Sequence, residues 1–95
     1  MRVQMTEVYR DWINALKDSA GRARVQMRID RLAHGNPGQH RNLTDGVSEL
    51  KIDVGPGYRV YYTERGGELV ILLAGGDKST QRQDIKTAIA LARNL

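Results

Sequence analysis

The fold is decided by residues 49–78, whose sequence is ELKIDVGPGYRVYYTERGGELVILLAGGDK. Polar and apolar residues first alternate, as in a strand with one buried face. An aromatic and β-branched segment follows, and then an apolar segment typical of a central strand. A Gly-Pro-Gly segment and a Gly-Gly pair separate the three segments and supply turn conformations. The sequence therefore predicts three antiparallel strands, at residues 49–54, 58–63 and 69–74.

The first predicted hairpin has a register that follows from the length of its turn. If residues 55–57 form a three-residue loop, Asp53 lies opposite Arg59, and side chains alternate between two faces along each strand. One face is then apolar, and we expect the other to be open to solvent, with Ala74 and Lys78 close to Arg59. The polar side chains on this candidate functional face are Glu49, Lys51, Asp53, Arg59 and Tyr61.

Length and composition indicate one small domain, which we expect to span residues 1–95. Hydrophobic residues make up 40% of the chain and charged residues 27%, the balance of a globular protein. No apolar run is long enough for a membrane span, and there is no signal-peptide pattern and no cysteine. We therefore expect a cytoplasmic protein without disulfides or thiolate metal sites. Two separated histidines make a metal cofactor unexpected. The formal net charge of +4 is compatible with a nucleic-acid partner.

The flanking segments predict helices. Apolar spacing over residues 7–16 and 22–34 indicates two amphipathic helices that form a hairpin on one face of the sheet. Residues 36–45 are polar, contain proline and glycine, and predict a loop. Residues 80–92 predict a C-terminal helix that opens with the capping box Thr-Gln-Arg-Gln. The predicted fold class is α+β: a small antiparallel β-sheet with an N-terminal helical hairpin packed on one face and a C-terminal helix.

Four arginines of the predicted helices form a candidate nucleic-acid-binding set. Arg24, Arg28 and Arg31 fall on one stripe of the second helix, and Arg82 lies in the first turn of the last helix. Charge runs on a helix are most often a solvated face. The alternative is a surface that contacts the backbone phosphates of a nucleic acid. The residues alone leave both interpretations open.

Three motifs, in this order, resemble a known family. They are GVSELKI at residues 46–52, GPGYRVYY at residues 55–62 and LLAGGDKSTQ at residues 72–81, followed by an Asp-Ile pair. Together they resemble the RelE/ParE superfamily of type II toxins, and more narrowly its HigB-like branch of addiction module killer proteins. The resemblance extends over nearly the whole chain, including Trp12 and the predicted helical hairpin.

The resemblance implies a function as well as a fold. It implies the toxin of a type II toxin–antitoxin system, an mRNA interferase that cleaves messenger RNA in the ribosomal decoding site, inhibits translation and arrests growth. The implied partners are the ribosome, messenger RNA and a cognate antitoxin, expected to be a small helix-turn-helix DNA-binding protein that joins it in a higher-order complex. No cofactor and no membrane partner is implied. Some superfamily members instead inhibit DNA gyrase without cutting RNA, which is the alternative; a nucleic-acid-binding module without activity is a third hypothesis.

The resemblance also implies roles for three basic residues. Arg59 matches the strand arginine that supports the transferred phosphate. Lys51 matches a basic residue of the preceding strand, and Lys78 a basic or histidine group after the last strand. Some RelE-type enzymes carry a catalytic tyrosine or histidine close to the C-terminus, whereas residues 92–95 contain neither. The catalytic set is therefore not transferred as a whole.

The chemistry of RNA cleavage gives these residues independent roles. Attack of a ribose 2′-hydroxyl on the adjacent phosphorus needs a base, an acid for the leaving oxygen and cations for the developing charge. Glu49 or Lys51 is the candidate base, and the planar fork of Arg59 can hold two phosphate oxygens. Tyr61 can stack on a nucleobase or position a phosphate, and Lys78 can stabilise charge or protonate the leaving group. Purely structural roles stay open for the same side chains: an Asp53–Arg59 ion pair, solvated Glu49 and Lys51, and packing by Tyr61.

Overall fold

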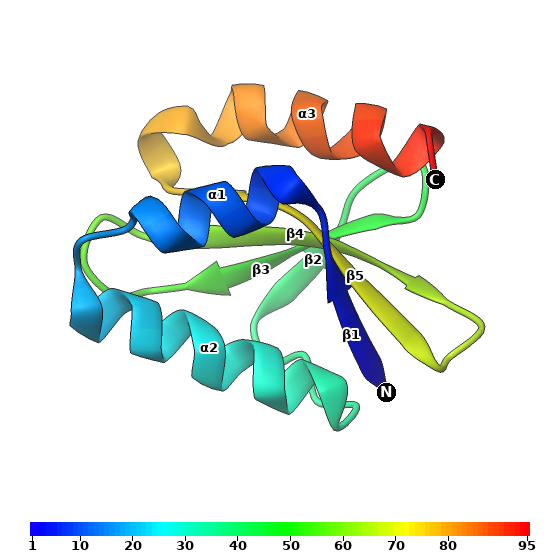
Figure 1. The fold of residues 1–95 in the computed structure, drawn as a ribbon, viewed down its shortest axis with the longest axis horizontal. Helices are drawn as coiled ribbons and strands as arrows, with labels where there is room; N and C mark the ends of the chain where they lie inside the picture. Colours follow the sequence, from blue (N-terminus) through cyan, green and yellow to red (C-terminus); the bar gives the residue numbers. More distant parts are fainter.

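The computed structural model describes residues 1–95, which form five strands, three α-helices and one 3₁₀ turn (Figure 1). In chain order the elements are β1 (Arg2–Met5), α1 (Glu7–Ala15), α2 (Ser19–Ala33), β2 (His40–Asn42), β3 (Val47–Ile52), β4 (Tyr58–Arg65), β5 (Leu69–Gly76), η1 (Lys78–Thr80) and α3 (Gln81–Arg93). The strand order is β1-β5-β4-β3-β2. α1 and α2 cover one face of the sheet and α3 covers the other. The predicted α+β class is confirmed, but β1 pairs with β5 in parallel, so the sheet is mixed rather than wholly antiparallel.

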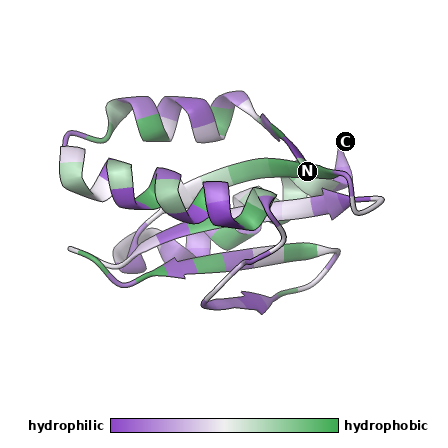
Figure 2. Cartoon of the chain, turned by 90° about the horizontal axis from the view of Figure 1, so that it is seen from below, coloured by the Kyte–Doolittle hydropathy of each residue, from purple (hydrophilic) through white to green (hydrophobic).

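The face under α1 and α2 holds an apolar core. Thr6 caps α1, because its side-chain oxygen accepts a hydrogen bond from the Tyr9 amide at 3.1 Å. Apolar spacing predicts Val8, Trp12, Ile13 and Leu16 on the inner side of α1; the last three pack against the core, but Val8 is 41% exposed and Tyr9 is buried instead. Figure 2 shows one strand of the sheet coloured as hydrophobic along most of its length, whereas hydrophobic and hydrophilic residues alternate along the helices. The residues of α2 in this core are Val25, Ile29 and Leu32.

The other face is closed by α3, so the expected open sheet face is wrong. Ala88 of α3 is fully buried and belongs to one apolar cluster with Tyr61 and Leu73, and Ile85 and Ile89 pack against this cluster. The helical spacing of the apolar residues at 80–92 predicts the helix, but it does not predict the face of the sheet on which the helix packs. The candidate functional face is therefore the floor beneath α3 instead of a free surface.

The start of α3 is organised by Asp77 rather than by the predicted Thr80 box. The Asp77 carboxylate accepts a hydrogen bond from the Ser79 amide at 2.8 Å, and Thr80 Oγ1 accepts one from the Asp77 amide at 3.4 Å. Thr80 makes no side-chain cap to α3, because its hydroxyl bonds the Asp84 carboxylate at 2.6 Å. Asp77 and Asp84 therefore organise the turn and the start of the last helix.

The first hairpin is two residues out of the predicted register. Residues 53–57 form the connection, so Lys51 lies opposite Arg59 and Glu49 lies opposite Tyr61. The predicted Asp53–Arg59 pair is therefore wrong, since Asp53 has left the strand and is exposed. A shift of two residues keeps every side chain on its predicted face. The predicted face of the sheet consequently survives an error in its pairing.

The strand β5 departs from prediction at a bulge and at its end. Tyr61 pairs with Ala74 and Tyr62 with Leu72, which leaves one residue of β5 extra and places Gly76, not Ala74, opposite Arg59. The predicted strand ends at residue 74, but Gly75 and Gly76 also belong to β5. A methyl group on Gly75 would overlap the Trp12 ring, and one on Gly76 would overlap Thr80 and Asp84. Both glycines therefore let elements approach closely, one on each face.

The polar segment before β3 also contributes to the sheet. His40–Asn42, predicted as part of a loop, forms the short edge strand β2 antiparallel to β3. Polar edge residues of this kind carry no alternation from which a strand can be predicted. Among the helices, none combines the length and the apolar character needed to cross a membrane.

Candidate active site beneath the last helix

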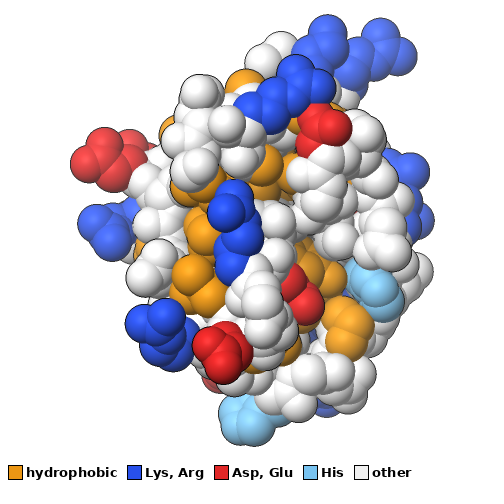
Figure 3. All heavy atoms as spheres, turned by 90° about the vertical axis from the view of Figure 1, so that its right-hand side faces the viewer, with side chains coloured by type: hydrophobic (Ala, Val, Ile, Leu, Met, Phe, Trp, Pro, Cys, Tyr) orange, Lys and Arg blue, Asp and Glu red, His pale blue; other side chains and the backbone are white.

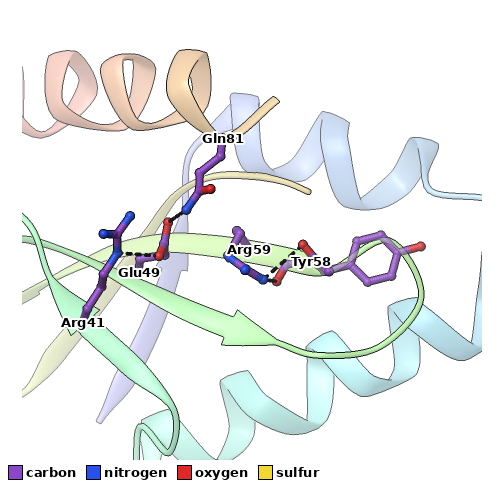
Figure 4. Close-up of polar contacts among 6 residues, drawn as sticks. Arg41, Glu49, Tyr58, Arg59 and Gln81 are labelled. Carbon is purple, nitrogen blue, oxygen red and sulfur yellow. Dashed lines mark hydrogen bonds and ion pairs between the residues drawn. The ribbon is translucent and has the colours of Figure 1, made fainter. Parts of the chain in front are cut away.

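Glu49 lies at the centre of a polar network that joins three elements. Its side chain on β3 is 0% exposed, and its carboxylate accepts hydrogen bonds from Arg41 Nε of β2 at 2.8 Å and from Gln81 Nε2 of α3 at 2.9 Å (Figure 4). Burial acts to raise the pKa of Glu49, but the hydrogen bonds from Arg41 and Gln81 and the Arg41 charge outweigh it and leave the pKa below its ordinary value. A buried carboxylate with both oxygens occupied is suited to anchoring α3 more than to accepting a proton from substrate.

Tyr61 is the cross-strand neighbour of Glu49 and is also 0% exposed. Its hydroxyl forms no well-aligned hydrogen bond. Burial raises the pKa of Tyr61, and the nearby Glu49 carboxylate raises it further. In this arrangement Tyr61 packs beneath α3 and presents no ring face on which a nucleobase could stack. An unpaired buried hydroxyl is unfavourable for folding, which marks this position as one where packing is not optimised.

Arg59 lies on the same floor, nearer the end of the sheet, and is 5% exposed. Its Nη1 donates to the carbonyls of Gly57 and Tyr58 at 3.1 Å and 3.0 Å, while its buried Nε has no partner (Figure 4). No carboxylate pairs with it, because the two ion pairs of the structure are made by other arginines. Arg59 is thus a buried cation with hydrogen-bonding capacity left over, as a site for a phosphate oxygen would require.

Two lysines lie beside Arg59. Lys51 is half-buried and directly opposite Arg59 across the β3–β4 ladder. Lys78 is exposed at the start of η1, and its aliphatic chain lies against Gly57, whose carbonyl Arg59 contacts. The structure therefore brings together three of the five predicted catalytic residues, which we call the cation cluster: Lys51, Arg59 and Lys78. Glu49 and Tyr61 lie deeper, under α3.

The predicted nucleic-acid-binding arginines lie apart from the cation cluster. Arg28 of α2 donates to the backbone carbonyls of Lys51, Pro37 and Gln39 at 2.6 Å, 3.0 Å and 2.9 Å, so its guanidinium holds the loop before β2 against the end of β3. Arg24 and Arg31 are exposed on the same helix. Arg82 is exposed on the first turn of α3, on the opposite face of the sheet.

Sequence reasoning missed two members of the Glu49 network, Arg41 and Gln81. Arg41 reaches Glu49 only because β2 pairs with β3, and the polar segment that forms β2 predicts a loop. Gln81 reaches Glu49 only because α3 packs on this face of the sheet. The available signal was the position of Glu49 within a predicted strand, because an acidic side chain needs a partner if it becomes buried.

Comparison with known proteins agrees with this architecture. Residues 11–95 match the family described as phage derived protein Gp49-like (DUF891). The chain belongs to this Gp49-like family. It is a toxin-like family of the RelE type, which accords with the predicted superfamily. The chain is also similar to an uncharacterized protein of Haemophilus influenzae, with 46% identity over 95 residues that cover all of this chain and 96% of that protein. No solved structure matches the chain.

Membership fixes the broad class of this Gp49-like protein. A toxin-like family implies, in general terms, an antitoxin partner and a cellular target. The family description names neither the target nor the residues that act on it. The choice between RNA cleavage and gyrase inhibition therefore depends on the chemistry of the site.

Proposed function

We propose that this Gp49-like protein is the toxin of a type II toxin–antitoxin system of the HigB-like branch and that it cleaves messenger RNA on the ribosome without a metal ion. The observation that carries the proposal is the cation cluster. Its three positive side chains gather at one end of the sheet, and its central arginine is buried with an unpaired Nε. A protein that acted only by binding another protein would have no need of a buried guanidinium that lacks a carboxylate partner at this point.

The proposed reaction is a transesterification. The ribose 2′-oxygen attacks the adjacent phosphorus, a bond forms between them, and the bond from phosphorus to the 5′-oxygen breaks. The 2′-hydroxyl loses its proton to a water molecule and the leaving 5′-oxygen gains one, so the products are a 2′,3′-cyclic phosphate and a 5′-hydroxyl. Arg59 stabilises the charge that develops on the phosphoryl oxygens. Lys51 adds positive charge at the same phosphate, and the exposed ammonium of Lys78 supplies the proton to the leaving oxygen.

The burial of Arg59 adds a step to this proposal. At 5% exposure, the guanidinium has to leave the Gly57 and Tyr58 carbonyls before it can hold a phosphate. The connection at residues 53–57 and the start of α3 border this position, so movement of either would admit the substrate. An antitoxin segment that lies across the cation cluster, with acidic side chains for complementary charge, would prevent this access.

The test is to induce the protein without an antitoxin and to map the 5′ ends of cellular messenger RNA. The expected result is growth arrest together with new 5′-hydroxyl ends inside coding regions, present only where ribosomes translate. Arrest with intact messenger RNA and with gyrase–DNA cleavage complexes would instead establish the gyrase alternative. A soluble, folded protein that affects neither growth nor RNA would contradict both.

A further inference from the structure

A pocket on the α2 face of the sheet carries positive charge that the proposed reaction does not use. It has a volume of about 280 Å³ and lies between α2, the loop at residues 37–39 and the end of β3. Three arginines and one aspartate line it, for a formal charge of +2. We call it the arginine pocket, and its charged residues are Arg24, Arg28, Arg31 and Asp53.

Arg28 forms the fixed wall of the arginine pocket. Its three carbonyl contacts hold the guanidinium in one orientation. Gly38, at a φ of +63°, lies against this group: a Cβ there would be 3.1 Å from Arg28 Nη2. The pKa of Arg28 is lowered, first by burial and then by the charge of Arg31. A half-buried cation that no carboxylate pairs with leaves positive potential in the pocket.

Arg24 and Arg31 supply the free donors. They stand four residues before and three residues after Arg28, so they flank it on the same face of α2. Neither takes part in an ion pair, and both are exposed. On the face that carries the end of α3 and the β4–β5 turn, basic and acidic side chains are intermixed (Figure 3). Of the three hollows on the surface, the arginine pocket is the one lined by three guanidinium groups.

The chemistry of the pocket selects an oxyanion with several acceptors. Guanidinium groups bind phosphate oxygens in pairs, and Arg24 and Arg31 can approach one phosphate from two sides. The pocket is small and two of its eight lining residues are hydrophobic, which suits a single phosphate group better than a nucleobase or an apolar side chain. A sequence-independent contact to a nucleic-acid backbone has this composition.

The arginine pocket and the cation cluster share one strand end. The carbonyl of Lys51 accepts the hydrogen bond from Arg28, whereas the Lys51 side chain lies on the opposite face beside Arg59. The residues that follow, from Ile52 to Val54, line the pocket. A single-stranded RNA that passes around the end of β3 therefore meets the pocket on one side of the sheet and the cluster on the other.

We propose that the arginine pocket binds a backbone phosphate of the same single-stranded RNA that the cation cluster contacts, with Arg24 and Arg31 as the contacting residues and Arg28 as the positioning residue. This inference rests on the proposed function for the identity of the RNA. It assigns to the pocket an anchoring role in which the base sequence of the RNA has no part.

The experiment measures binding separately from cleavage. The probe is a fluorescent single-stranded RNA oligonucleotide whose riboses are 2′-O-methylated, because it lacks the 2′-hydroxyl nucleophile and cannot be cleaved. Its affinity is measured by anisotropy over a range of salt concentrations for the wild-type protein and for Arg24→Gln/Arg31→Gln. The matched control is Arg2→Gln/Arg10→Gln, which removes the same charge from exposed positions of β1 and α1. Arg28 is left intact, because its loss would release the loop before β2 from the end of β3.

The pocket variant should bind at least about 10-fold more weakly, and the slope of log affinity against log salt should fall by about 1.4, or about 0.7 for each lost phosphate contact. The control variant should change both quantities much less. Equal losses in the two variants would show that only overall charge matters and would overturn the proposal, as would unchanged binding in the pocket variant.

Two further outcomes separate this inference from the proposed function. If the wild-type protein leaves cellular RNA intact but the pocket variant alone binds the probe weakly, the phosphate site stands and the cleavage proposal fails. If the wild-type protein cleaves RNA and the pocket variant binds and cleaves equally well, the pocket inference fails alone.

A second readout is the Nε–H resonances of Arg24 and Arg31 in labelled protein, which should shift when the probe is added and stay unchanged with inorganic phosphate at the same phosphate concentration. A response to inorganic phosphate without one to RNA would mark a free-anion site and overturn the proposal.

Discussion

The face of the sheet under α1 and α2 and the face under α3 bury different kinds of group. Under the helical hairpin, eleven buried residues form one apolar cluster, whose side-chain polar atoms are tyrosine hydroxyls. Under α3 the apolar cluster has six buried residues and shares its face with the buried polar residues Glu49, Arg59 and Thr63. Buried charges oppose folding unless they are well paired. The face under the α1–α2 helical hairpin, which we call the hairpin face, therefore supplies most of the stability. This allows the face under α3, the α3 face, to retain a polar site.

The sharpest test of this division is Arg59→Ala. If the α3 face serves function, the variant should lose RNA cleavage by about 10² or more, on the scale of removing one transition-state contact, and remain folded. Arg59→Lys should lose less, and Lys51→Ala and Lys78→Ala should be intermediate. The measurement is cleavage of messenger RNA beside the thermal unfolding midpoint.

The matched control for Arg59 is Arg65→Ala, at the exposed far end of the same strand. It should leave both cleavage and the unfolding midpoint close to those of the wild type. An Arg59→Ala protein that unfolds at growth temperature, or one that keeps full toxicity, would show that the α3 face is structural.

One added methyl group should disrupt the packing of the hairpin face. Gly75→Ala would push into the Trp12 ring, and overpacking of this kind destabilises by about 1–3 kcal/mol. Urea denaturation measures the free energy of unfolding. Because the clash is with one side chain, Trp12→Leu combined with Gly75→Ala should be less destabilised than the sum of the two single variants. Additive effects would mean that the strand and not the ring resists the methyl group.

Variants of the Glu49 network test whether the buried charges of the α3 face are well paired. Arg41→Ala should lower the free energy of unfolding at pH 7 by about 1.5 kcal/mol, the low end for a charged hydrogen bond because Arg41 is 48% exposed and screened by solvent. The lowered pKa of Glu49 means that its stabilising contribution is present above the ordinary value of 4.5 and disappears as the pH falls through the folded-state pKa.

Glu49→Gln therefore provides the pH control. Its unfolding free energy should lie below that of the wild type at neutral pH, and the gap should narrow under acid conditions, below about pH 4.5. Urea titrations from pH 3 to pH 7 measure the gap. A constant gap at all pH values would mean that the carboxylate charge is not what the network stabilises.

The smallest expected effects concern tyrosine hydroxyls of the hairpin face. The buried Tyr9 hydroxyl has no hydrogen-bond partner, so Tyr9→Phe should leave the protein as stable or more stable by up to about 1 kcal/mol. The Tyr58 hydroxyl donates to Asp18 at 2.7 Å, a bond that raises the pKa of Tyr58 to about 12. Tyr58→Phe should therefore lower the thermal unfolding midpoint. Equal responses of the two variants would remove the distinction between paired and unpaired hydroxyls.

The sequence predicts the hairpin face better than the α3 face, for physical reasons. Alternation and helical spacing depend on neighbours along the chain, so they locate the main strands and helices from residue types alone. The cation cluster was predicted despite a wrong register, because a two-residue shift keeps Lys51 and Arg59 on one face. The β5 bulge, the strand β2 and the covering by α3 depend on contacts between distant segments. Arg41 and Gln81 were missed because their contacts with Glu49 exist only after those segments have assembled.

The parallel pairing of β1 with β5 has a consequence for how the chain folds. β1 is made before the other elements of the sheet, yet its only neighbour there is β5, which is made after the other strands, and the Thr6 hydroxyl donates to the carbonyl of Leu73, 67 positions later. Contacts so distant in sequence slow folding, because a long loop must close before any of them forms. A nascent chain can build the α1–α2 hairpin early, but its sheet stays incomplete until β5 has emerged. Ribosome-bound chains that end before residue 69 should therefore expose β1 to protease, whereas the released protein protects it.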